Sequence, residues 1–162
     1  MSTLIRNATV YDGTGAPPQL DTDVSISEER IVNIGQSLPV SGYKNIIDAK
    51  GLGLMPGIID SHTHYDAQVT WDPSLDPSPA HGVTTVIMGN CGFGIAPCRP
   101  SDRDLIMRNL TQVEGMDLEA LRAGINRDFE DFPEYLDSMD ERGVLPNVAA
   151  FVGHSALRTY VM

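Results

Sequence analysis

The stretch PGIIDSHTH, residues 56–64, decides how this chain is expected to fold. Within it, residues 57–60 form a short apolar run bounded by proline, glycine and polar residues. This pattern is typical of a strand of a parallel sheet that is buried on both of its faces. The stretches VTTVIM (83–88) and NVAAFV (147–152) follow the same pattern. We therefore expect three parallel strands, each covered on both faces.

Between the second and third of these strands, apolar residues recur at helical spacing. Residues 106–125 contain two such patterns, the first with Ser101 as its expected N-cap. Residues 132–139 contain a third, with Asp131 as N-cap and Gly143 as the stop signal. The order strand, crossover, strand, helices, strand predicts a parallel α/β domain over residues 56–162.

The part of the chain before this domain has a different character. Short β-rich runs alternate with Gly, Pro and Asp turn signals, and no helical pattern occurs among them. Residues 1–55 are therefore expected to form a small sheet of four or five strands, which is too thin to bury much core alone. The expected strands lie near residues 4–10, 24–27, 31–34 and 45–48, with a fifth short run near 51–54.

The composition excludes some classes of function. The chain has 162 residues, with 22 acidic and 11 basic side chains and a net charge of −11. This acidity counts against a general nucleic-acid binder and against charge-driven binding to an anionic membrane. No apolar run approaches the roughly 20 residues of a membrane span, and the first residues do not resemble a signal peptide. Two cysteines are too few for a disulfide scaffold, so a reduced, cytoplasmic setting is expected.

The most informative side chains are His62 and His64, directly after the first parallel strand. Because side chains alternate along a strand, these two imidazoles are expected to project to the same side, with Asp60 one layer deeper. Two adjacent imidazoles can chelate one metal ion, and the carboxyl ends of parallel strands are where α/β folds place their active sites. The alternative is a pair of hydrogen-bonded loop histidines.

The second candidate is Cys91, in the segment GNCGFG (89–94) that follows the second parallel strand. A thiolate is a good zinc ligand, and Cys91 is expected at the same rim as the two histidines. Alone, it would be interpreted as a small buried apolar residue. Together with His62 and His64 it is predicted to bind the metal, whereas Cys98 is interpreted as structural.

Other polar residues are less decisive. His154 follows the third strand, where it could line a substrate pocket, orient a ligand or serve as a cap. His81 precedes its strand and is interpreted as structural, while Asp66 and Asp72 either touch the site or stabilise turns. A further set of acidic residues is expected to form a solvated face: Glu114, Asp117, Glu119, Asp128, Glu130 and Asp131.

Taken together, these motifs resemble a known family. Residues 56–64 are similar to the first-strand motif of the amidohydrolase superfamily, and GVTTV (82–86) is similar to its second strand. The segment GNCGFGIAP (89–97) resembles more narrowly the N-acyl-D-amino-acid deacylases, or D-aminoacylases, as does VGHSALR (152–158). The resemblance runs across nearly the whole chain.

The resemblance implies a fold and an activity. It implies a metal-dependent (β/α)₈ barrel of which residues 56–162 supply the first three strands, and a composite β-sandwich to which residues 1–55 belong. It also implies zinc as cofactor and hydrolysis of a small N-acyl-D-amino acid to a D-amino acid and a carboxylate. His62 and His64 match the family's more weakly binding metal pair, and Cys91 matches its zinc-binding cysteine.

The family's other metal histidines and its acid/base aspartate correspond to positions beyond Met162, so no catalytic residue is assigned. We therefore expect the chain to be a fragment that is inactive alone. Two rival functions stay open: a cyclic-amide hydrolase like hydantoinase or dihydroorotase, against which Cys91 counts, and a non-catalytic metal-binding assembly module. The sequence also leaves oligomerisation open.

Overall fold

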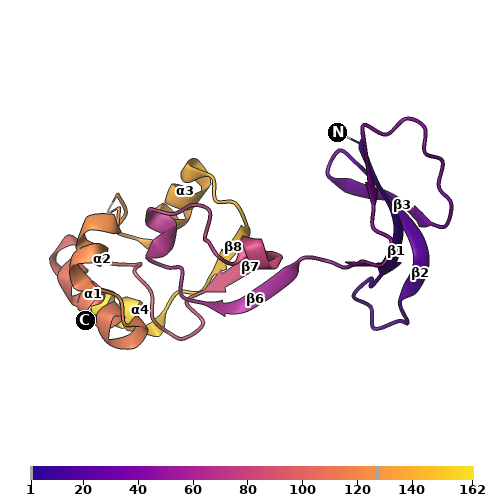
Figure 1. The fold of residues 1–162 in the computed structure, drawn as a ribbon. Helices are drawn as coiled ribbons and strands as arrows, with labels where there is room; N and C mark the ends of the chain where they lie inside the picture. The colour runs from indigo at the N-terminus through magenta and orange to yellow at the C-terminus, as the bar shows by residue number, and fades with distance from the viewer. Residues whose placement is uncertain (1, 127) are drawn as a thin grey trace. The chain divides into compact units, whose positions relative to one another are not determined.

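The computed structural model describes residues 2–126 and 128–162 of the chain (Figure 1). These fall into two compact units, the first ending at Pro56 and the second running from Gly57 to Met162. In the described part of the chain, every helix is too short or too polar to span a membrane.

The first unit is a five-stranded sheet. Its strands pair in the order β3-β2-β1-β4, with β5 also paired to β1. β1 is antiparallel to β2 and parallel to β4. The buried apolar cluster of this unit contains four described residues, and large apolar side chains such as Ile31 and Ile46 remain exposed, so the expectation of a thin sheet is confirmed. The strand bounds are Ser2–Val10 (β1), Gln19–Ser27 (β2), Arg30–Gly35 (β3), Asn45–Asp48 (β4) and Gly53–Leu54 (β5).

The second unit has a three-stranded parallel sheet in the order β6-β7-β8, which confirms the predicted α/β class and the parallel strands. The strands are Ile58–Thr63 (β6), Val83–Met88 (β7) and Asn147–Ala150 (β8). The α-helices are Arg103–Glu114 (α1), Leu118–Gly124 (α2), Phe132–Arg142 (α3) and His154–Val161 (α4). Three short 3₁₀ helices are Gln68–Thr70 (η1), Pro79–His81 (η2) and Pro100–Asp102 (η3).

One face of this sheet is buried and the other is open. Val86 and Met88, which share a face of β7, pack in one core with buried residues of all four α-helices. On the other face of the sheet, Ile59 of β6 is 64% exposed, and Phe151, directly after β8, is 55% exposed. The expectation that both faces are covered is therefore wrong for the described chain. The apolar runs predicted two buried faces, but in the described chain all four α-helices contribute to a single core.

The helix starts follow the expected chemistry in one case and depart from it in another. Asp131 accepts a hydrogen bond from the Glu134 backbone N–H (2.8 Å), and the Glu134 carboxylate accepts one from the Asp131 backbone N–H (3.2 Å). This capping box begins α3 as predicted, and Gly143 ends it in the left-handed conformation. Ser101, however, is not the N-cap of α1: it lies inside η3, because Pro100 begins a 3₁₀ turn first and α1 starts at Arg103.

The capping box leads to a stability prediction. Replacing Asp131 by alanine is expected to lower the free energy of unfolding by about 1 kcal/mol, because a backbone N–H of the first turn loses its acceptor. Urea denaturation followed by circular dichroism measures the loss. Asp137→Ala is the matched control, since Asp137 is exposed on the same helix. Equal losses in the two variants would contradict a capping role for Asp131.

Candidate metal centre

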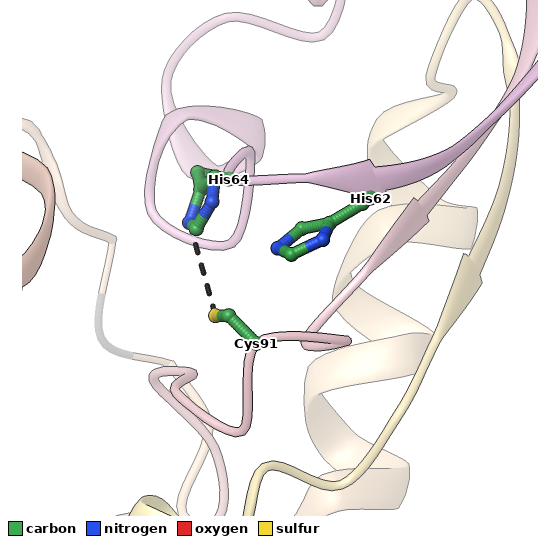
Figure 2. A group of neighbouring side chains, drawn as sticks. All are labelled: His62, His64 and Cys91. Atoms are coloured by element: carbon green, nitrogen blue, oxygen red, sulfur yellow. Dashed lines mark hydrogen bonds between the residues drawn. The ribbon is translucent and has the colours of Figure 1, made fainter.

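The two histidines at the carboxyl end of β6 lie side by side. Their ring centroids are 5.2 Å apart and the rings are inclined by 39° (Figure 2). Thr63 between them is buried, and its hydroxyl donates a hydrogen bond to the Ile87 carbonyl (3.0 Å). His62 and His64 therefore share the exposed side, as strand alternation requires. The Asp60 carboxylate accepts a hydrogen bond from the His62 backbone N–H (3.2 Å).

Cys91 reaches the same place from the loop after β7. Gly89 and Gly92 both have positive φ, and the Gly92 N–H donates to the Gly89 carbonyl (3.0 Å), so the chain turns tightly around Cys91. This turn brings Cys91 Sγ within 3.8 Å of His64 Nδ1 (Figure 2). The loop is also fastened to β6, because the Asn90 side-chain amide donates to the Ser61 carbonyl (2.9 Å).

The structure thus gathers all three residues that the sequence singled out as metal ligands. One possible ligand atom from each of His62, His64 and Cys91 lies within 4.8 Å of the other two. Ligands of one tetrahedral zinc ion are separated by about 3.3–3.8 Å, given Zn–N near 2.0 Å and Zn–S near 2.3 Å. Small side-chain movements would close the remaining gap, and two imidazoles with one thiolate form a donor set suited to zinc. Their role as ligands stays a prediction.

The other histidines and cysteine lie apart from this cluster. His154 is the exposed first residue of α4, and its neighbour Ser155 donates a backbone hydrogen bond to the Gly92 carbonyl (2.9 Å). This bond brings the start of α4 next to the Cys91 turn, and a role for His154 in substrate binding stays a prediction. His81 lies in η2 ahead of β7, and Cys98 is buried in the core.

Sequence reasoning missed the burial of Glu114 beside His64. Its side chain is only 5% exposed, and its Oε1 lies 3.1 Å from His64 Nδ1. The expectation of a solvated position is therefore wrong for this residue. A signal was available, because Ile106, Leu110 and Glu114 are spaced four residues apart, and the first two face the core. An acid that continues an apolar stripe is a candidate for burial.

Asp66 is the second buried acid near the histidines. Burial raises the pKa of its carboxyl to about 7; the negative charge of Glu114 also raises it, and backbone hydrogen bonds from Asp66 and Gly89 oppose the rise. The Tyr135 hydroxyl holds the Asp66 carbonyl by a hydrogen bond of 2.9 Å. Asp66 therefore adjoins the site, whereas Asp72 stabilises a turn by accepting a hydrogen bond from the Ser74 backbone N–H (3.0 Å).

Comparison with known proteins finds a family model that matches most of the chain and relatives that match nearly all of it. The sequence model of the amidohydrolase family matches residues 45–162. An N-acyl-D-aspartate deacylase of Alcaligenes xylosoxydans xylosoxydans is 36% identical over 159 residues, covering 98% of this chain and 29% of that protein.

Two solved structures share the fold. A D-aminoacylase variant in complex with copper chloride gives a TM-score of 0.77 at 35% identity, over 99% of this chain and 31% of its own. An N-acyl-D-glutamate deacylase from Bordetella bronchiseptica, complexed with zinc and a phosphonate inhibitor, gives 0.78 at 32% identity over the same shares. This chain therefore spans less than a third of each of these three proteins. The chain therefore belongs to the amidohydrolase family.

Proposed function

We propose that this chain is part of a zinc-dependent amide hydrolase that deacylates N-acyl-D-amino acids. The observation that carries the proposal is the convergence of His62, His64 and Cys91 from two adjacent parallel strands. The H-x-H pair is the feature shared with amidohydrolases in general, and the cysteine is the feature shared with the deacylases. The named relatives, which act on N-acyl-D-aspartate and N-acyl-D-glutamate, support the same substrate class.

The proposed architecture is the family's barrel. Strands β6, β7 and β8 would be the first three of a (β/α)₈ barrel, and residues 1–55 would belong to a composite β-sandwich. Two observations support this assignment: the open face of the parallel sheet, where Ile59 is exposed, and the exposed apolar side chains of the first sheet. Exposed apolar surface of this kind marks a place where other segments or partners pack.

His62, His64 and Cys91 would hold the zinc ion in the proposed enzyme. Bound zinc lowers the pKa of a coordinated water to about 7 and polarises the amide carbonyl. Cys91 would act as a ligand and not as a nucleophile, because a metal-bound thiolate has its electron pair engaged. The acid/base group that protonates the leaving amine is expected from a later strand, so the 162-residue chain alone should not turn over substrate.

A chimera tests this proposal. Residues 1–162 replace the matching part of the D-aminoacylase relative, and the product is assayed with zinc on N-acetyl-D-methionine, N-acetyl-L-methionine and hydantoin. We expect hydrolysis of the D-substrate by the chimera and none by the chain alone. A folded, zinc-loaded chimera without activity would contradict the proposal, and rapid turnover by the chain alone would contradict its expected inactivity. Preference for hydantoin would favour the cyclic-amide alternative.

A further inference from the structure

Glu114 makes a long-range contact with one of the two histidines. It is the last residue of α1, and its Oε1 lies 3.1 Å from Nδ1 of His64, fifty positions earlier in the chain. The carboxylate is almost fully buried, whereas the His64 side chain is 41% exposed. The acid therefore lies on the protein side of the imidazole, and the ring itself faces outward.

Burial at position 114 is energetically unfavourable for a carboxylate. The Glu114 side chain is 5% exposed, and within the described residues its second carboxylate oxygen, Oε2, has no hydrogen-bond partner. Burying charged groups with incomplete pairing lowers stability. An apolar side chain continuing the stripe of Ile106 and Leu110 would pack there at lower cost. The contact with His64 is the interaction that an apolar side chain could not make.

Of the three clustered residues, the one that Glu114 contacts is His64. Among the described residues, the cluster of possible ligand atoms contains His62, His64 and Cys91, and Glu114 lies outside it. An imidazole that donates a hydrogen bond from Nδ1 keeps its lone pair on Nε2, so a carboxylate on Nδ1 selects the tautomer and fixes the ring. Cys91 Sγ lies 3.8 Å from the same Nδ1, a longer and weaker contact than the one with Glu114.

We propose that Glu114 is a positioning residue, which accepts a hydrogen bond from His64 Nδ1 and thereby presents Nε2 to the metal. The inference rests on the proposed metal site, and it adds a carboxylate–histidine–metal arrangement to it. Partners of this kind raise the basicity of the imidazole and reduce its freedom to rotate, and their loss typically lowers metal affinity by about 10–100-fold.

The first test uses the metal-free chain. Nitrogen-15 NMR of the imidazoles at about pH 8, where an ordinary histidine is neutral, reports which ring nitrogen of His64 carries the proton. We expect the Nδ1–H tautomer in the wild type and in Glu114→Gln, whose amide oxygen still accepts a hydrogen bond. In Glu114→Ala we expect a shift to Nε2–H. An Nε2–H tautomer in the wild type would overturn the proposal whether or not metal binds.

The second test titrates the chain with Co²⁺ and Zn²⁺. Affinity should fall about 10–100-fold in Glu114→Ala and less in Glu114→Gln, and should be unchanged in Glu141→Gln, a control at an exposed glutamate of α3. Unchanged or tighter binding by Glu114→Ala would overturn the proposal, since tighter binding means that the carboxylate competes with the metal for Nδ1. A wild type that binds neither metal would instead refute metal binding by His62, His64 and Cys91 of this chain alone, and the tautomer measurement would still decide the role of Glu114. Circular dichroism verifies that each variant is folded.

Discussion

Replacing Cys91 by alanine is expected to abolish stoichiometric zinc binding by this chain. The thiolate is the one anionic donor among the three clustered residues, and its removal leaves two neutral imidazoles. Loss of a residue that only hydrogen-bonds to a metal ligand already lowers metal affinity by about 10–100-fold. Loss of a direct ligand should therefore lower the affinity by more than about 100-fold. Elemental analysis after dialysis against a weak chelator measures the zinc retained per chain.

Cobalt substitution gives an independent readout for the same variant. A thiolate bound to Co²⁺ produces a near-ultraviolet charge-transfer band, which should be present in the wild type and absent in Cys91→Ala. Cys98→Ala is the matched control, because Cys98 is the other cysteine and is buried in the core away from the histidines. It should lower stability but keep both the zinc and the band. Unchanged zinc content in Cys91→Ala would refute the assignment of Cys91 as a ligand.

The convergence of Cys91 with the histidines was predictable because it follows from strand order. A short apolar run identifies each strand, and parallel pairing brings the carboxyl ends of neighbouring strands to one edge. Residues directly after two such strands must then be neighbours, whatever the length of chain between them. The capping box at Asp131 was predictable for a simpler reason, since its partners are three residues apart.

Two features could not be predicted in this way. The pairing of His64 with Glu114 depends on where α1 ends relative to β6, and no local pattern relates residues fifty positions apart. The exposure of Ile59 also escaped prediction. An apolar strand sequence indicates that both faces of the strand suit burial, but it does not indicate whether this chain contains the segments that cover them. Both depend on tertiary packing.

Substitution of Gly89 by alanine should destabilise the second unit by about 2–5 kcal/mol. Gly89 has φ of +75°, a conformation that costs an L-residue about 1–2 kcal/mol. An added Cβ would also lie 2.5 Å from the carbonyl oxygen of Phe151, a backbone atom just after β8. The Phe151 N–H donates to the Met88 carbonyl (2.9 Å), so the Phe151 backbone cannot move away without breaking this hydrogen bond between β7 and the end of β8. The steric overlap therefore adds about 1–3 kcal/mol to the loss of stability.

Gly92→Ala separates the two contributions. Gly92 has φ of +85°, but apart from its chain neighbours no described residue has an atom within 4 Å of an added Cβ, so only the conformational cost of about 1–2 kcal/mol applies. Urea denaturation should therefore show a larger loss of unfolding free energy for Gly89→Ala than for Gly92→Ala. Equal losses would mean that the close approach to Phe151 does not destabilise the Gly89→Ala variant. Since Gly89 sets the path of the chain from β7 to Cys91, Gly89→Ala should also weaken zinc binding. A variant that is destabilised but binds zinc normally would show that the turn at Cys91 forms independently of this close approach.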